Sequence, residues 1–258
     1  MKRTLSIIAP VALALATCSC IVEKRHTADG SLADGLEGNS IKVEEFDKID
    51  LSGAGTIYYT QAPADSIRVE ADAKDLKLIK IEQQGSTIYI GWKDEFRQRI
   101  AKFNHNRIII YASSLNLTEV KLGGAGDFKA DDIIKVEDLR VNAAGASKIE
   151  LNRIEANSLK VSTAGAGSIE IDSAAVKTFY AKMSGAADFD ASLYESDQVD
   201  IDVSGAGDVT LELNKCGDVN LDVSGAASVD IQGDARSLSK SKSGMASIDI
   251  DKLTLANK

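Results

Sequence analysis

Cysteine and histidine are scarce in this chain of 258 residues, which has three cysteines and two histidines. Cys18 and Cys20 lie close to the start, so the rest of the sequence contains a single cysteine, Cys216. A lone cysteine cannot form an intramolecular disulfide, which excludes a disulfide-stabilised fold. His26 and His105 are isolated residues, so the sequence predicts no metal centre and no cofactor.

Positive charge is also in short supply. Lysine and arginine total 30 against 39 aspartates and glutamates, which gives a formal net charge of −9 at pH 7. Proteins that bind nucleic acid neutralise its phosphates with basic side chains, so we expect no nucleic-acid partner. Nucleotide-binding fingerprints and the patterns of nucleophilic catalysis are absent as well.

Apolar runs long enough to span a bilayer are missing. The run Ile7–Ala16 is far shorter than the roughly 20 residues that a transmembrane helix needs. It follows the basic start Met1-Lys2-Arg3, which is typical of a secretory signal. It ends in Leu15-Ala16-Thr17-Cys18-Ser19-Cys20, which resembles the end of a bacterial lipoprotein signal, where a cysteine becomes acylated.

Residues 1–19 are therefore predicted to be a signal peptide with a lipobox-like end. Cys18 is favoured as the lipidated residue because Leu15 stands three places before it, and Cys20 is the alternative. An ordinary signal peptide with two incidental cysteines is a second interpretation. Residues 20–40 are polar and glycine-rich and predict a flexible tether, and residues 41–258 predict one folded domain.

The most informative feature present is a repeat of small residues such as Ser204-Gly205-Ala206-Gly207. From the third copy onward, each central glycine follows the previous one by 19 to 21 residues. A constant period of this length indicates stacked, nearly identical units. The central glycines of the eight copies are Gly53, Gly124, Gly145, Gly165, Gly185, Gly205, Gly225 and Gly244.

Apolar and polar residues alternate on both sides of each glycine, and this period of two predicts β-strands. About twenty residues are too few for a βαβ unit but suit one coil of a parallel β-helix. We therefore predict an all-β solenoid with repeat coils over about residues 117–250. The nine-residue calcium-binding β-roll does not fit, because its period differs and Phe128 stands where a ligand would.

The alternation also predicts which side chains are buried. The fourth and sixth residues after each central glycine carry no charge in any copy, so Val209 and Leu211 should point inward and Thr210 outward. The small residues should turn a tight corner where neighbouring coils pack together. Ala206 should lie between Ala186 and Ala226 there, so that a leucine in its place would overpack the corner. Near the C-terminus, Lys240 and Lys242 replace apolar residues, so residues 238–258 are predicted to cap the stack.

Residues between Gly53 and Gly124 lack the motif but contain extended segments, and they predict a wider N-terminal part of the same stack. Within it, aromatic and basic residues interleave from Trp92 onward. One interpretation is a binding patch for a glycan or an anionic surface, formed by Trp92, Phe96, Arg97 and Arg99. The other is an amphipathic segment that covers the open edge of the stack.

Carboxylates are abundant at the outward positions, and two functions could use them: catalysis and calcium binding. Paired carboxylates serve glycoside hydrolysis, and stacked ones such as Asp202 and Asp222 could bind Ca²⁺ weakly. Lys121 and Lys182 share their column and offer a simpler charge balance. An active site would make one coil differ from its neighbours, yet the coils from Gly165 to Gly225 look alike. No enzymatic activity is therefore predicted.

The segment from Phe46-Asp-Lys-Ile-Asp-Leu-Ser-Gly-Ala-Gly55 through the serial Ser-Gly-Ala-Gly-Asp-Val motifs resembles the head GIN domain family of auto-transporter adhesins. The likeness covers about residues 41–250. It implies a right-handed parallel β-helix like that of pectin lyases, without their catalytic residues, and a role in cell adhesion at the surface of a Gram-negative bacterium. No binding residues of that family can be carried over.

Together these observations predict an exported, non-catalytic protein that is lipid-anchored in the cell envelope, in the outer membrane. It would bind a glycan or a protein through its broad faces and could form homo-oligomers. The competing hypotheses are a polysaccharide-active enzyme on the same scaffold and a structural envelope protein without a specific ligand.

Overall fold

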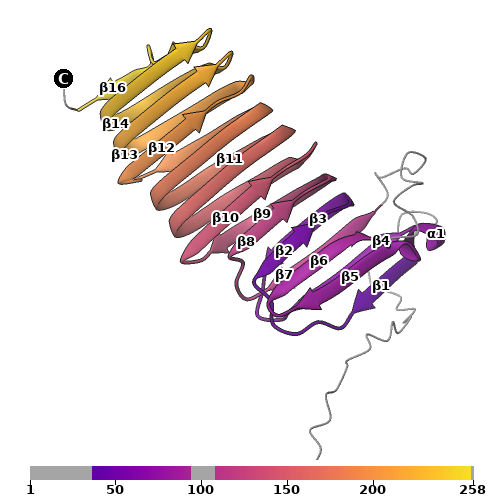
Figure 1. Ribbon diagram of the computed structural model, residues 1–258. Coiled ribbons are helices and arrows are strands. Elements are labelled where there is room, and N and C mark those ends of the chain that lie inside the picture. Colours follow the sequence, from indigo (N-terminus) through magenta and orange to yellow (C-terminus); the bar gives the residue numbers. More distant parts are fainter. Residues whose placement is uncertain (1–36, 94–107, 257–258) are drawn as a thin grey trace, which may run out of the picture.

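The computed structural model describes residues 37–93 and 108–256, and these are almost entirely β-strands (Figure 1). The N-terminal elements are β1 (Glu37–Ile41), β2 (Lys48–Leu51), β3 (Ala54–Gln61), β4 (Ser66–Ala71), α1 (Ala73–Leu76), β5 (Ile79–Gln84), β6 (Thr87–Trp92) and β7 (Ile109–Ser114). The repeats form β8 (Glu119–Leu122), β9 (Ala125–Lys135), β10 (Asp138–Ala143), β11 (Lys148–Tyr194), β12 (Gln198–Val203), β13 (Asp208–Gly225), β14 (Ser228–Gly244), β15 (Ser247–Asp249) and β16 (Leu253–Leu255).

The repeats stack as the coils of a parallel β-solenoid, which confirms the predicted fold class. Val199 pairs with Val219, and Ile201 pairs with Leu221, so each strand lies beside the strand one coil later. Elements such as β11 run through several coils because the hydrogen-bonded ladder continues around the corners. The result is an elongated rod of stacked coils (Figure 1).

Each coil contributes one strand to each of two broad sheets, which lie on either side of the core. The strand before each central glycine belongs to sheet A, and the strand after it belongs to sheet B. Sheet A thus contains β8, β10 and β12, whereas sheet B contains β3, β9 and the first part of β13. We call the outer surfaces of these sheets face A and face B.

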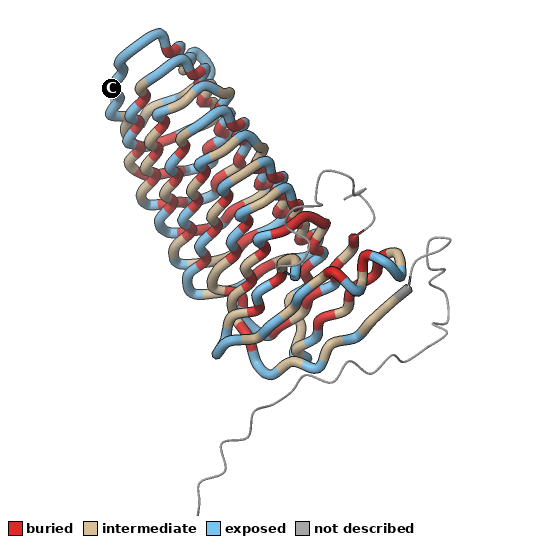
Figure 2. The backbone as a smooth tube through the Cα atoms, turned by 45° about the vertical axis from the view of Figure 1, so that its right-hand side comes forward, coloured by how far each residue is buried: buried red, intermediate tan, exposed pale blue. Residues whose placement is uncertain are grey.

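The interior is a set of apolar ladders, one rung per coil. Residues four and six places after the central glycine are buried throughout the repeats except in the last coil, where Ile248 and Ile250 are half-buried. Val209 is 1% exposed and Leu211 is 0% exposed, whereas Thr210 is exposed, so the predicted register is confirmed. Figure 2 shows this alternation of buried and outward residues along the coils.

The corners stack as predicted, but the prediction that a larger side chain at Ala206 would overpack the corner was wrong. Ala206 forms a bridge with Ala186 one coil earlier, yet both side chains are exposed. The crowded position belongs to the glycine instead: a Cβ on Gly205 would lie 2.0 Å from the carbonyl oxygen of Gly185. The physical reason is that the glycine faces the backbone of the preceding corner while the alanine points to solvent.

Two forms of corner alternate from Gly124 to Gly225. Where the second residue after the central glycine is buried serine or alanine, as at Ser147, Ala187 and Ala227, the central glycine has a positive φ. Where that residue is another glycine, as at Gly167 and Gly207, the central glycine does not. A positive φ at the central glycine thus accompanies a side chain that is buried two residues later, whereas the next corner has a glycine at that position.

The N-terminal part is built differently from the repeats. Its extended segments are strands, as predicted, but several pair antiparallel: β1 with β4, β4 with β7, and β5 with β6. These strands extend both sheets, so that β1 ends sheet B and β5 ends sheet A. Strand β1 starts at Glu37, four residues before the predicted domain start.

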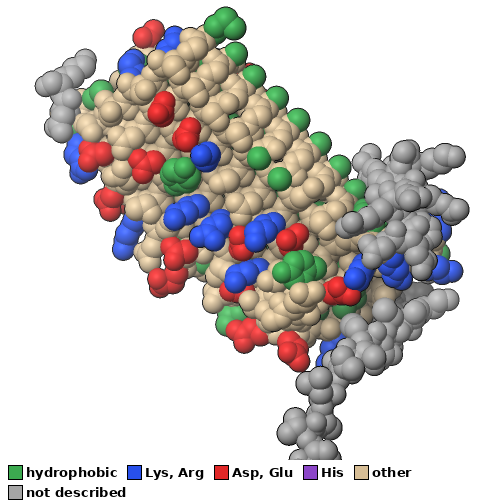
Figure 3. All heavy atoms as spheres, in the orientation of Figure 1, with side chains coloured by type: hydrophobic (Ala, Val, Ile, Leu, Met, Phe, Trp, Pro, Cys, Tyr) green, Lys and Arg blue, Asp and Glu red, His purple; other side chains and the backbone are tan. Residues whose placement is uncertain are grey.

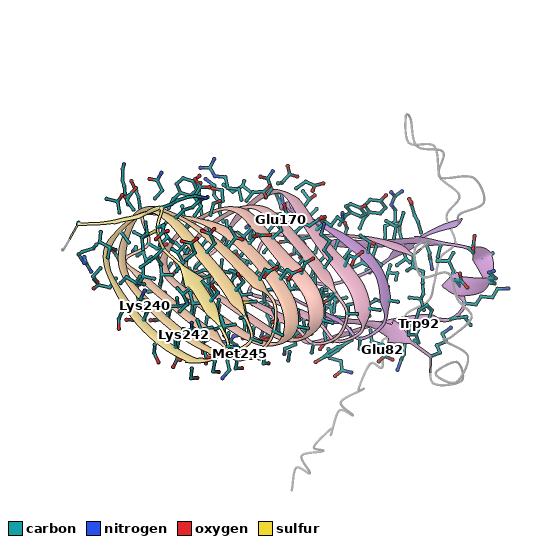
Figure 4. All side chains as sticks on the ribbon, turned by 90° about the horizontal axis from the view of Figure 1, so that it is seen from above. Glu82, Trp92, Glu170, Lys240, Lys242 and Met245 are labelled. Atoms are coloured by element: carbon teal, nitrogen blue, oxygen red, sulfur yellow. The ribbon has the colours of Figure 1, made fainter. Side chains whose placement is uncertain are left out.

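The C-terminal coil places charge where the other coils have apolar residues. Lys240 pairs with Leu221 and Lys242 with Val223, both in the inward ladder of sheet A, and both lysines are exposed at the open end (Figure 4). A further coil stacked on this end would bury two unpaired charges, which is strongly unfavourable. Inward-pointing charge of this kind discourages edge-to-edge association.

Candidate binding surface

Face A carries two shallow depressions in the repeat region. One depression is lined by Ser158, Lys160, Thr178, Phe179, Tyr180, Gln198 and Asp200. A second adjoins it and is lined by Tyr180, Asp200, Ile201, Asp202, Asn220, Leu221, Asp222, Ser239 and Ser241. Tyr180 and Asp200 belong to both, so the two depressions form one continuous strip that crosses the strands along the rod.

The charged side chains of face A fall into two groups. Figure 3 looks onto this face and shows basic side chains over the middle coils and acidic ones over the coils nearer the C-terminus. The division follows one column of side chains, five places before each central glycine. From β8 to β14 this column contains Glu119, Arg140, Lys160, Tyr180, Asp200, Asn220 and Ser239.

Two carboxylates of the column already have partners from the same face. Glu119 accepts a hydrogen bond from Asn142 Nδ2 at 3.2 Å and forms an ion pair with Lys121 at 3.2 Å. Asp200 Oδ1 accepts hydrogen bonds from Gln198 Nε2 at 2.9 Å and from Asn220 Nδ2 at 2.8 Å. These contacts hold the carboxylates in fixed positions.

Two cations of face A have no such partner. Within residues 37–93 and 108–256, the side chains of Arg140 and Lys160 form neither an ion pair nor a hydrogen bond. Both are exposed, and they are direct register partners on β10 and β11. The outward pattern of the sequence drew attention to the carboxylates and not to these cations, although both stand in the column five places before each central glycine.

A clamp links the last two coils at the edge of face A. Arg236 donates two hydrogen bonds to Asp218, at 3.0 and 2.6 Å, and Ser237 Oγ donates a third at 2.6 Å. These donors stabilise the carboxylate and lower the pKa of Asp218 to about 2. Because the folded-state pKa lies below the ordinary value, this contribution to stability is present at neutral pH and is lost as the pH falls toward 2.

On the N-terminal half of face B, in contrast, several charged and aromatic groups are paired with one another. Glu150 forms ion pairs with both Lys129 and Lys148, and these hydrogen bonds lower the pKa of its carboxyl group. Tyr58 stacks on Tyr111 with ring centroids 5.8 Å apart, and the guanidinium of Arg68 lies 4.6 Å from the centre of the Tyr111 ring. These neighbours occupy the groups that could otherwise contact a ligand.

The predicted aromatic and basic patch is only partly within the described residues. Trp92 ends β6 near the N-terminal end of the rod and is half-buried (Figure 4). A Cβ on Gly53 would lie 3.0 Å from Trp92 Nε1, so the indole packs against the first small-residue corner. Phe96, Arg97 and Arg99 lie outside the described residues, as do Cys18 and Cys20.

The two carboxylates considered as a weak calcium site stand on adjacent strands. Asp202 is the register partner of Asp222, and Lys121 and Lys182 share their column, as predicted. Lys182 Nζ lies 3.6 Å from Asp202 Oδ2 and balances part of that charge. Among the described residues, no group of three or more histidine, cysteine, aspartate or glutamate side chains could hold a metal ion.

Cys216 is buried at a corner, and its Sγ lies 3.6 Å from the carbonyl oxygen of Leu193. Burial raises the pKa of its thiol, so it stays protonated at neutral pH.

In the described part of the chain, no helix is long and apolar enough to cross a membrane.

Fold and surface together define a β-solenoid of stacked coils with two regular outer faces, one of them hollowed and unequally charged. A family model described as "Putative auto-transporter adhesin, head GIN domain" matches residues 45–235. The chain therefore belongs to the head GIN domain family, as the sequence motifs predicted. No functionally curated protein matches it.

Solved structures of similar fold come from Bacteroides and Parabacteroides species. A putative adhesin from Bacteroides fragilis is 21% identical with a TM-score of 0.72, and the match covers 84% of this chain and 98% of that one. A putative lipid binding protein from Parabacteroides distasonis is 20% identical with a TM-score of 0.65, covering 84% and 96%. A putative adhesin from the same organism is 19% identical with a TM-score of 0.60, covering 84% and 97%. At these identities the comparison shows the fold alone.

Proposed function

We propose that this protein is a non-catalytic adhesin, which holds a rigid solenoid at the cell surface and binds its ligand through face A. The observation that carries the proposal is the contrast between the two faces. Face A has a continuous strip of depressions with free polar and basic groups. On face B, in contrast, the lysines Lys129 and Lys148 are paired with Glu150, and Tyr58 is stacked on Tyr111. Membership of an adhesin family supports a binding role.

A second candidate, a polysaccharide-active enzyme, is less well supported. The Asp200 carboxylate is held by two amide donors. Glycoside hydrolysis needs two carboxyl groups in different environments, so that one acts as an acid and the other as a base or nucleophile. The strip instead combines aromatic, amide, hydroxyl and basic groups, which suit binding.

The proposed anchor is a lipid on Cys18, with Cys20 as the alternative, at the outer membrane of a Gram-negative cell. We expect metabolic labelling with a fatty acid to modify the wild-type chain and one of the two variants Cys18→Ala and Cys20→Ala, because only one cysteine stands directly after the cleavage site. The variant that loses the label identifies the acylated residue. Label retained in both variants would refute the anchor.

The ligand class can be tested with the chain produced from residue 21 onward, applied to arrays of bacterial and host glycans and of envelope proteins. We expect saturable binding to one ligand class. Substitutions on face A, such as Asn220→Ala, should weaken it, whereas Thr210→Ala on face B should not. Absence of any saturable binding would favour a structural envelope protein.

A further inference from the structure

The middle of face A contains a pair of neighbouring cations that lowers the stability of the fold and forms no stabilising contact in exchange. Arg140 and Lys160 are register partners on neighbouring strands of a sheet, where strands lie about 4.8 Å apart. Like charges placed directly opposite each other in a sheet are destabilising. In a chain with a net charge of −9, carboxylates to separate them are plentiful, yet the nearest one in the column, Glu119, is already held by Lys121 and Asn142.

The neighbouring rungs supply groups of a different kind. Tyr180 follows Lys160 in the same column and lies at the centre of the strip of depressions. Ser158, Thr178 and Gln198 line the depression beside it and offer hydroxyl and amide groups. An aromatic ring next to such groups matches a sugar, which presents apolar C–H faces and a rim of hydroxyls, and the two cations match a negative charge on it.

We propose that Arg140, Lys160 and Tyr180 bind an acidic glycan, a chain of sugars that carry carboxylate or sulfate groups. This inference rests on the proposed function and names its ligand class. The rung spacing of about 4.8 Å is comparable to the length of one sugar residue in an extended chain. The glycan lies along the rod, across the strands, with successive sugars on successive coils.

The charges on the C-terminal side limit the length of this site. Beyond Tyr180 the strip is acidic, with Asp200, Asp202 and Asp222 on the next coils. These carboxylates repel an acidic chain, so the anionic groups of the ligand contact only the middle coils. They also disfavour a longer polyanion such as nucleic acid, in agreement with the net charge of the chain.

The test uses the purified full-length protein in detergent and isothermal titration with three probes: oligogalacturonate, the neutral galactose oligomer of the same length, and a sulfated galactose oligomer. We expect the acidic probes to bind about tenfold more tightly than the neutral one, since hydrogen bonds to charged groups are the stronger ones. The oligogalacturonate and sulfated probes separate carboxylate from sulfate recognition. Affinity should stop rising once the oligomer covers the rungs from Arg140 to Tyr180.

The variants assign the residues. Arg140→Gln combined with Lys160→Gln should weaken acidic-probe binding by about tenfold or more. Lys252→Gln removes the charge of an exposed lysine elsewhere and should leave it unchanged. Tyr180→Ala should weaken binding while Tyr180→Phe retains it, because the ring face makes the contact. Far-ultraviolet circular dichroism checks that each variant is folded.

Three results would overturn the inference. Equal affinity for acidic and neutral oligomers, unchanged in the double variant, would exclude these cations as a site and leave the proposed function standing. Equal binding of inorganic polyphosphate would show general attraction of polyanions rather than recognition of a glycan. Dimerisation of the wild type that the double variant abolishes, without glycan binding, would assign face A to a second copy of the chain.

Discussion

Replacement of Gly205 by alanine is expected to destabilise the solenoid by about 3 kcal/mol or more, at or above the upper end of the usual cost of overpacking. The new Cβ would lie 2.0 Å from the carbonyl oxygen and 2.8 Å from the nitrogen of Gly185. Neither backbone atom can rotate away, and the same carbonyl accepts a hydrogen bond from the Ala206 nitrogen at 2.8 Å. Urea unfolding followed by circular dichroism measures the change.

The matched control is the adjacent residue. Ala206→Leu adds more atoms, but Ala206 is exposed, so the change in unfolding free energy should stay within about 0.5 kcal/mol. A stable Gly205→Ala variant together with a destabilised Ala206→Leu variant would mean that the corner faces the opposite way.

Truncation of an interior leucine should have a comparable effect for a different reason. Leu211 is fully buried and is stacked between Ala191 and Ile231 on the neighbouring coils. Leu211→Ala should cost about 2–5 kcal/mol, because the lost apolar contact leaves a cavity that a regular stack closes only in part. The same urea titration measures it.

Glu212, the next residue, provides the comparison. It is exposed on face B, so Glu212→Ala should change the unfolding free energy by less than about 0.5 kcal/mol. Reversed effects at Leu211 and Glu212 would place the whole register one residue out, because a shift of one exchanges the two faces of a strand.

The solenoid could be predicted because the sequence contains two independent periods. The spacing of the glycines shows that the units repeat, and the alternation around Val209 and Leu211 shows which face is buried. The corner was harder. Which small residue is crowded depends on how one corner rests on another, so Gly205 and Ala206 could be told apart only from the stacked backbone.

The N-terminal part illustrates a second limit. The extended segments there were visible, but alternation is the same in a parallel and an antiparallel strand. The antiparallel pairing of β4 with β7 therefore required the structure. Arg140 and Lys160 illustrate a third, because their significance depends on which neighbours are already paired, and spacing does not show this.

The central claim is that ligand binding uses face A, and steric masking tests it most directly. Thr178 on face A and Thr210 on face B are both exposed threonines in strands, so each can be changed to cysteine and coupled to a polyethylene glycol maleimide. The unmodified chain treated with the same reagent reports any reaction at the other cysteines, and Cys216 is buried. Binding to the array ligand should be lost with the polymer at Thr178→Cys and kept with the polymer at Thr210→Cys. Loss of binding only when the polymer is attached on face B, or equal binding with the polymer at either position, would contradict the account.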